Sequence, residues 1–243
     1  MPQIQMDRIF GQILRYLFVL CIPLLVLSSS IHAVAGTRDV YEYGFSKYNV
    51  AETTELSEEQ LSKIASKLLS YLQGDATTPQ LVVTTGSGAQ FPLFHAYELV
   101  HLADVRWLFE LNRRLLLLAV LSIATYVLWH VLKEQGEWTQ VASGALCGSI
   151  ITVGLLTVIG LAGLIDFRGL FVLFHALSFD NPFWLLDPSK DYLIMLFPAG
   201  FWQDVALLTG ALTGTKALFL GGTAWALLRR RQSIRSYDSA TVT

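Results

Sequence analysis

Four long apolar stretches alternate with polar segments along this chain. They cover approximately Tyr16–Ala35, Leu115–Leu132, Gly144–Ile165 and Val205–Leu228. A helix needs about 20 residues to cross the roughly 30 Å hydrocarbon core of a bilayer, so each stretch can form one transmembrane helix. The third stretch is the cleanest and contains no charged residue. The pattern therefore predicts four transmembrane helices.

The segment between the first two stretches, Gly36–Asn112, has a periodicity of its own. Apolar residues recur there at helical spacing opposite a polar face, which predicts an amphipathic helix. These residues are Leu61, Ile64, Ala65, Leu68, Leu69 and Leu72. Ser57 and Gln60 have the spacing of a capping box at the start of this helix, and Gly74 is suited to end it.

A hairpin and a further helix are predicted before the second stretch. The β-prone residues Leu81–Thr85 and Gln90–Phe91 flank the turn sequence Gly86-Ser87-Gly88. A helix over about Tyr97–Leu111 then runs directly into the second span. The predicted fold class is an all-α membrane protein, with four transmembrane helices and a small mixed α/β extracytoplasmic cap.

The basic residues predict the orientation in the membrane. The tail begins with Arg229-Arg230-Arg231, and such clusters remain cytoplasmic. Four spans then place the N-terminus, with Arg8 and Arg15, on the same side. The pair Arg113-Arg114 disagrees, because it adjoins the outer end of the second span. We expect a multi-pass protein of a bacterial-type cell membrane with both termini in the cytoplasm.

This orientation divides the chain into alternating membrane and outer parts. The predicted parts are an N-terminal tail with the first transmembrane helix (1–35), an extracytoplasmic cap (36–112), the second and third transmembrane helices with a short cytoplasmic loop (113–165), an extracytoplasmic re-entry segment (166–204), the fourth transmembrane helix (205–228) and a cytoplasmic tail (229–243). Ala33-Val34-Ala35 resembles a signal-peptidase site, and cleavage there would leave the sidedness of the later segments unchanged.

Composition and motifs exclude several classes of function. Hydrophobic residues make up 53% of the chain and charged residues 15%, whereas a soluble domain has about 25% charged residues. The net charge of −2 gives no indication of nucleic-acid binding. Cys21 and Cys147 lie in apolar stretches, which argues against a disulfide scaffold or a zinc site. The sequence has no serine elbow, phosphate loop or metal-ligand spacing, so we expect no cofactor and no metal.

His101 lies in the predicted helix that leads into the second span. Glu98 and Asp104 are three positions before and after it, so the three residues share one stripe of the helix. A carboxylate beside an imidazole fixes its tautomer and favours the protonated form that a general base reaches during turnover. The same residues are also common on an ordinary solvated helix, and the pattern alone leaves both interpretations open.

His175 lies in an apolar stretch, Leu170–Leu177, just after the third span. It is either a hydrogen-bonded core residue or part of a site. The polar and aromatic segment that follows includes Asn181, Trp184 and Asp191. That segment is either an ordinary turn at the membrane interface or a rim that holds a polar head group close to the lipid surface.

Lys216 lies near the middle of the fourth span, where a charge costs several kcal/mol unless it has a partner. No acidic residue lies inside any predicted span. One hypothesis is therefore an ion-handling protein or transporter centred on this lysine. Four spans without inverted repeats or broken helices argue against it.

Two segments together resemble a known family. The run Glu98-x-x-His101-x-x-Asp104-Val105 is similar to one motif of the lipoprotein intramolecular transacylases and their uncharacterised membrane relatives. The stretch from Phe171 through His175 and Trp184-Leu185-Leu186-Asp187-Pro188 to Phe201-Trp202 resembles the other. The resemblance implies an acyltransferase at the outer membrane face. It would move one acyl chain of a diacylglyceryl-modified lipoprotein from the glyceryl ester to the amino group of the N-terminal cysteine.

The resemblance also implies that His101 and His175 are catalytic. Our first hypothesis makes His101 the general base, oriented by Glu98 or Asp104. His175 is then the acid or oxyanion stabiliser, and the two roles are exchangeable. Asn181, Trp184 and Asp191 are the predicted substrate-binding residues. The expected partners are the diacylated lipoprotein and membrane lipid.

The alternative function is non-enzymatic, a membrane assembly or scaffold protein that binds a partner through its outer cap. It predicts that His101 and His175 lie far apart in space.

Overall fold

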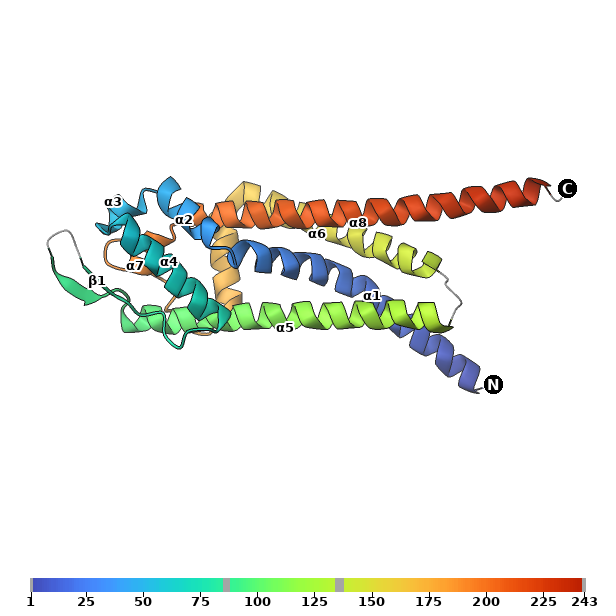
Figure 1. The fold of residues 1–243 in the computed structure, drawn as a ribbon, viewed down its shortest axis with the longest axis horizontal. Coiled ribbons are helices and arrows are strands. Elements are labelled where there is room, and N and C mark those ends of the chain that lie inside the picture. The colour runs from blue at the N-terminus through green and yellow to red at the C-terminus, as the bar shows by residue number, and fades with distance from the viewer. Residues whose placement is uncertain (1, 85–87, 134–137, 242–243) are drawn as a thin grey trace. The chain divides into compact units, whose positions relative to one another are not determined.

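The computed structural model describes residues 2–84, 88–133 and 138–241, and these form a mostly helical fold with one small hairpin (Figure 1). The elements in chain order are α1 (Pro2–Ala35), α2 (Arg38–Lys47), α3 (Val50–Thr54), α4 (Glu58–Gln73), β1 (Val82–Thr84), β2 (Gln90–Pro92), α5 (Ala96–Lys133), α6 (Trp138–Ser178), α7 (Tyr192–Leu196) and α8 (Ala199–Thr241).

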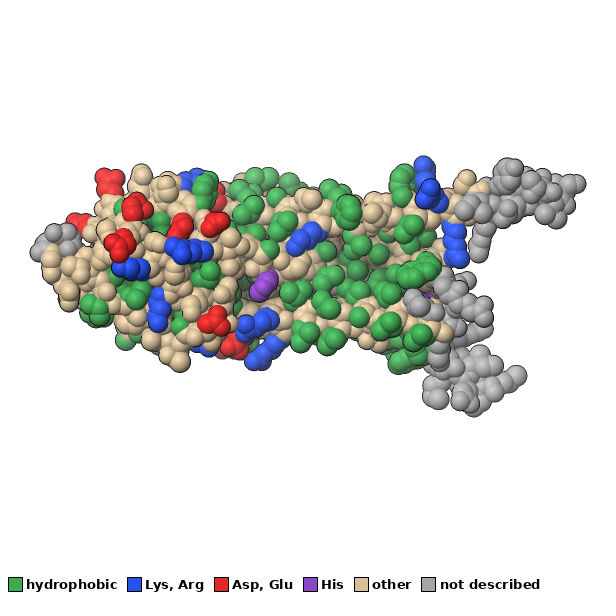
Figure 2. All heavy atoms as spheres, viewed as in Figure 1, with side chains coloured by type: hydrophobic (Ala, Val, Ile, Leu, Met, Phe, Trp, Pro, Cys, Tyr) green, Lys and Arg blue, Asp and Glu red, His purple; other side chains and the backbone are tan. Residues whose placement is uncertain are grey.

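Among the described residues, four helices are long and apolar enough to cross a membrane. They cover Ile9–Ala35, Ala96–His130, Trp138–Ser178 and Ala199–Ser233. The four predicted spans lie in α1, α5, α6 and α8, which confirms the predicted fold class. On the face shown in Figure 2, hydrophobic side chains predominate over the long helices, whereas charged side chains gather over α2 and α4.

The chain forms two compact units. Unit 1 consists of residues 1–30, 114–160 and 210–243, and unit 2 consists of residues 31–113 and 161–209. Both predicted outer segments, 36–112 and 166–204, fall in unit 2. The predicted domain boundaries and their sidedness stay predictions.

In unit 1, small residues of α6 allow a close approach to α1. A Cβ atom added at Gly144 would lie 2.8 Å from the ring of Phe18, and one added at Gly148 would lie 2.6 Å from Ile22. The ring of Phe18 in turn stacks on Tyr126 of α5, with centroids 4.4 Å apart. Glycine at these two positions lets the helix backbones pack at short range, as is common in membrane bundles.

Unit 1 also gives Lys216 a partner. Its Nζ donates a hydrogen bond of 2.9 Å to the hydroxyl of Ser29 in α1. The sequence did not indicate this partner, because the acceptor is a neutral side chain far from Lys216 along the chain.

In unit 2, α4 has the predicted N-terminal capping box and the predicted apolar face. Ser57 and Gln60 form both hydrogen bonds of the capping box, and Gly74 ends the helix with φ of +96°. A positive φ is open to glycine without steric cost. Of the six predicted apolar positions, five are buried and Leu69 is half-buried. The amphipathic-helix prediction is confirmed.

The predicted hairpin is also present. Strands β1 and β2 pair antiparallel, with Val83 opposite Phe91. Gly86 and Ser87 of the predicted turn lie outside the described residues. The predicted helix after the hairpin is the first part of α5, which continues without a break into the second span.

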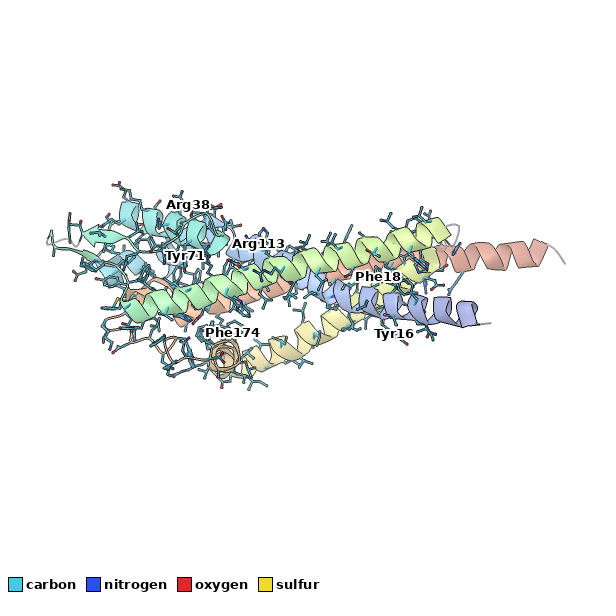
Figure 3. The ribbon with its side chains drawn as sticks, turned by 90° about the horizontal axis from the view of Figure 1, so that it is seen from below. Tyr16, Phe18, Arg38, Tyr71, Arg113 and Phe174 are labelled. Atoms are coloured by element: carbon cyan, nitrogen blue, oxygen red, sulfur yellow. The ribbon has the colours of Figure 1, made fainter. Side chains whose placement is uncertain are left out.

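The helix α6 breaks at Asp166, which has non-helical angles of φ −151° and ψ 85°. Its side-chain Oδ1 accepts a hydrogen bond of 2.8 Å from the backbone N–H of Gly169. This is the bond of an N-cap residue, so a new helix begins here. We call residues 167–178 the post-kink helix. In Figure 3 this helix, which bears Phe174, is seen end-on, whereas α5 is seen along its length.

Candidate active site

His101 and His175 come together in unit 2. His101 lies on α5 and His175 on the post-kink helix, and their ring centroids are 5.9 Å apart with an angle of 36° between the ring planes. Both side chains are buried, with 6% and 8% of their surface exposed. The scaffold hypothesis predicted that these histidines would lie far apart, and the structure contradicts that prediction.

Aromatic rings surround this histidine pair. Phe179 packs edge-on against His101 at 5.0 Å between centroids. Phe171 and Trp184 lie 4.2 Å and 5.2 Å from the ring of His175. Such an apolar wall excludes water, and polar interactions inside it are stronger than in solvent.

The two imidazoles differ in their hydrogen bonds. Nδ1 of His175 lies 2.8 Å from the backbone carbonyl oxygen of Phe171. A carbonyl oxygen can only accept, so Nδ1 carries the proton and the lone pair of neutral His175 is on Nε2. Nδ1 of His101 is buried and has no hydrogen-bond partner within the described part of the chain. One ring therefore has a fixed tautomer and the other has an unsatisfied nitrogen.

Asp104 lies on the same helix as His101 but binds a different group. Its Oδ2 accepts a hydrogen bond of 2.8 Å from the side-chain amide of Asn181. Among the residues that the structure describes, no hydrogen bond joins His101 to Asp104. The bond to Asn181 connects α5 to the loop that follows the post-kink helix.

Glu98, the other predicted orienting carboxylate, is completely buried and directed toward other groups. Its Oε2 accepts from the backbone N–H of His95 at 2.7 Å and lies 3.0 Å from Nδ1 of that residue. Its Oε1 accepts from the backbone N–H of Leu193 at 2.8 Å. The bond to the N–H of His95, directly before α5, is half of a capping box.

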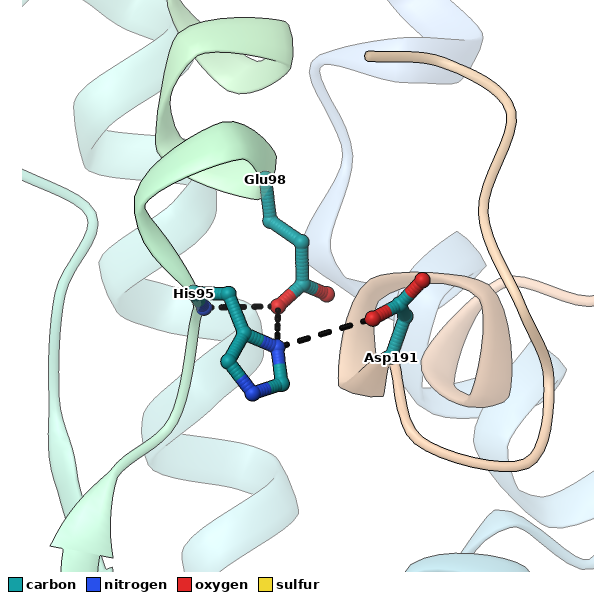
Figure 4. A group of neighbouring side chains, drawn as sticks. All are labelled: His95, Glu98 and Asp191. Carbon is teal, nitrogen blue, oxygen red and sulfur yellow. Dashed lines mark hydrogen bonds and ion pairs between the residues drawn. The ribbon is translucent and has the colours of Figure 1, made fainter.

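Asp191, a predicted substrate-binding residue, is also bonded to the protein itself. It is 1% exposed, and it accepts hydrogen bonds from the Tyr97 hydroxyl and, at 2.7 Å, from the backbone N–H of Asp187. Its other neighbour is Nδ1 of His95, at 3.5 Å. Figure 4 shows His95 between Glu98 and Asp191.

His95, Glu98 and Asp191 have the donor types of a metal site. One ligand atom from each lies within 4.8 Å of the others. The carboxylate oxygens, however, already accept backbone N–H or side-chain donors. A cation bound here would displace those hydrogen bonds, so the cluster is better suited to holding chain segments together.

The loop from Asp180 to Lys190 has short-range bonds of its own. The side chain of Asn181 accepts from the N–H of Phe183 at 3.1 Å. Ser189 donates to the carboxylate of Asp187 from its hydroxyl at 2.7 Å and from its N–H at 3.0 Å. These two bonds lower the pKa of the Asp187 carboxyl. The loop therefore has a defined conformation beside the histidine pair.

A sequence profile of the lipoprotein intramolecular transacylase family, Lit, matches residues 16–202. The match covers most of the chain and both histidine-bearing segments. The chain belongs to the Lit family. It is therefore a membrane enzyme that transfers an acyl chain within a lipoprotein and produces the lyso-form. The non-enzymatic alternative is excluded by this membership.

Solved structures show the same fold. The membrane integral transacylase Lit from Bacillus cereus matches with a TM-score of 0.77 and 18% identity, over 92% of this chain and 98% of that one. Two structures of histidine variants of the same enzyme, one to arginine and one to alanine, match with TM-scores of 0.72 and 0.73 at 17% identity. They cover 96% and 95% of this chain, and 98% and 99% of the variants. No curated protein sequence matches significantly.

Sequence reasoning missed two members of the polar cluster, His95 and Tyr97. One local signal was available: a glutamate three positions after His95, directly before a long helical pattern, is typical of a capping box. The contacts of Asp191 carried no comparable signal, because its partners come from a distant segment.

Proposed function

We propose that the histidine pair is the catalytic centre of this Lit enzyme. The substrate is a lipoprotein whose N-terminal cysteine carries a diacylglyceryl group, bound at the outer membrane face. The cysteine amine attacks one glyceryl ester, and the acyl chain moves from oxygen to nitrogen. The main support is the approach of two buried imidazoles to 5.9 Å inside an aromatic enclosure.

The reaction balances with proton transfers alone. The amine nitrogen forms a bond to the ester carbonyl carbon and loses a proton. The tetrahedral intermediate then breaks its bond to the glyceryl oxygen, and this oxygen takes up the proton. One group must accept a proton and return it, and another must stabilise the oxyanion. The balance requires no cofactor, no metal and no covalent enzyme intermediate.

The tautomers favour the reverse of our first hypothesis, with His175 as the general base and His101 as the oxyanion stabiliser. Because Nδ1 of His175 donates to the Phe171 carbonyl, its Nε2 is ready to accept the amine proton. The buried Nδ1 of His101 has no partner among the described residues, and an unpaired acceptor is tolerated in a protein interior more readily than an unpaired N–H. This places the proton of His101 on Nε2, where it can donate to the oxyanion. His175 is then the base and subsequent acid, and His101 is the oxyanion donor.

Positioning supplies a large part of the rate. Nucleophile and ester belong to one molecule, and an intramolecular reaction gains effective molarity when its groups are held in attack geometry. Trp184, packed on His175, and Asn181, bonded to Asp104, are suited to hold the head group near the pair. Asp191 has its hydrogen bonds filled by the protein and takes no direct part in substrate binding in this proposal.

The post-kink helix supports access from the lipid phase. The side chains of Val172, Leu173, Phe174 and Leu177 are between 44% and 79% exposed, whereas His175 on the same helix is buried. A short helix with exposed apolar side chains is stable where lipid covers it. The acyl chains of a membrane-anchored substrate then remain in lipid while its ester reaches the histidines.

The test is mass spectrometry of lipoprotein N-termini in a transacylase-free host that expresses each variant. We expect His175→Gln and His175→Ala to lose conversion to the lyso-form equally, because an amide cannot take up the amine proton. His101→Gln retains a donor, so we expect it to be more active than His101→Ala. His32→Gln is the matched control, since His32 lies outside the site.

Normal conversion by any of the alanine variants would refute the assignment of that histidine. Equal loss in His101→Gln and His101→Ala, with partial activity in His175→Gln, would reverse the two roles.

A further inference from the structure

We propose that Glu98 and Asp191 form a carboxylate latch that positions the loop 180–190 against the histidine pair. The latch comprises these two carboxylates with their donors from His95, Tyr97, Asp187 and Leu193. Both acidic residues are positioning residues that do not touch the substrate. The inference rests on the proposed role of the histidine pair.

The latch joins two distant segments in both directions. Glu98, in the first turn of α5, accepts from the backbone N–H of Leu193 in α7. Asp191, directly before α7, accepts from the hydroxyl of Tyr97 in α5. Each segment therefore supplies one carboxylate and one donor to the other. This reciprocity fixes the start of α7 relative to the start of α5.

Burial makes the latch specific. Glu98 and Asp191 are 0% and 1% exposed. A carboxylate out of water is stable only when charge-assisted hydrogen bonds replace its hydration. Glu98 has three such contacts from His95 and Leu193. Moving either segment would break bonds that buried groups cannot replace with water.

Both carboxylates of the latch lie on segments that carry or contact the proposed catalytic histidines. Glu98 lies one helical turn before His101 on α5. Asp191 closes the loop whose Trp184 packs on His175 and whose Asn181 bonds to Asp104. A fixed latch therefore sets the distance between the loop and the histidines, and a displacement of about 1 Å near reacting groups can cost about 100-fold in rate.

The experiment uses the full-length enzyme in lipid nanodiscs with a diacylated lipoprotein substrate. We expect Glu98→Ala to lower kcat/KM about 100-fold, in proportion to the displacement it permits. Glu98→Gln keeps an acceptor for Leu193 but presents an NH₂ group to His95, so its loss is intermediate. Tyr97→Phe removes one donor from Asp191, and its loss is smaller again. We expect KM to rise in each case, whereas a loss of folded protein alone would lower only the apparent kcat.

Hydrogen exchange measures the latch independently of catalysis. We expect faster exchange in peptides covering residues 180–190 of the Glu98 and Tyr97 variants, with exchange in α4 unchanged. Glu59→Gln is the matched control, because this carboxylate pairs with Lys63 on the surface of the same unit. It should alter neither activity nor loop exchange.

His101→Ala and His175→Ala separate this proposal from the proposed function. If the histidines are not catalytic, these variants remain active while the latch variants still loosen the loop. Unchanged loop exchange in Glu98→Ala and Tyr97→Phe overturns the latch. A metal site would make Glu98→Gln as inactive as Glu98→Ala and the enzyme sensitive to a chelator, and that result also overturns it.

Discussion

His101 and His175 lie 5.9 Å apart between ring centroids, yet their hydrogen bonds differ. A backbone carbonyl fixes the tautomer of His175, whereas Nδ1 of His101 has no partner among the described residues. The two rings are therefore chemically distinct in the resting enzyme. This distinction allows one to accept a proton while the other donates a hydrogen bond.

The bond between Asp104 and Asn181 should contribute to activity as a unit. We expect Asp104→Ala and Asn181→Ala each to lower the rate about tenfold, equivalent to about 1.4 kcal/mol. The double variant should be scarcely worse than either single variant, because both remove the same interaction. Initial rates in nanodiscs measure this cycle. Independent, multiplied losses would contradict the coupling.

Gly44 of α2 should be intolerant of any side chain. An added Cβ would lie 2.4 Å from a carbon of the Phe201 ring. We expect Gly44→Ala to destabilise the fold by about 1–3 kcal/mol through overpacking. Thermal unfolding in detergent measures the shift. Gly210→Ala is the control, because no described residue lies within 4 Å of its added Cβ. Equal stability of the two variants would count against the packing argument.

Lys216 should be dispensable for transacylation. Its bond to Ser29 gives it a local partner in unit 1. We expect Lys216→Met to retain the rate within about twofold and to be as stable as the parent or more so, because a central charge costs about 2.5–3.5 kcal/mol in a membrane helix. Conversion of a lipoprotein reporter and thermal unfolding measure both effects. Loss of conversion in a folded Lys216→Met variant would contradict this prediction and show that transacylation needs the lysine.

The orientation can be tested by cysteine labelling. In a background with Cys21→Ala and Cys147→Ser, we expect a cysteine at Lys190 to react with a membrane-impermeant maleimide on intact spheroplasts. A cysteine at Gln232, beside the arginine cluster, should react only after lysis, because clustered arginines remain cytoplasmic. The opposite labelling pattern would invert the proposed topology.

Local patterns predicted most of the fold. The four spans, the amphipathic α4 and the hairpin follow from periodicity, and the cap at Ser57 follows from spacing. The histidine pair followed from the resemblance of two motifs, whereas each histidine taken by itself also had an ordinary structural interpretation. Each of these features depends on residues close together in the sequence or on two recognisable segments.

Such local patterns could not predict the long-range contacts. Glu98 was predicted to orient His101, but its hydrogen bonds go to His95 and Leu193. Helical spacing places two residues on one stripe without showing which way a flexible side chain turns. Asp191 was predicted to bind substrate. Its burial against Tyr97 could not be foreseen from local patterns, because that contact joins residues 94 positions apart.

The break at Asp166 restarts the helix that carries His175. In a continuous helix, each inserted residue turns everything that follows by about 100°. Here the capped start at Asp166 begins a new helical phase. The direction in which His175 faces is therefore set by its distance along the chain from Asp166, so one residue inserted between them would turn the imidazole away from His101.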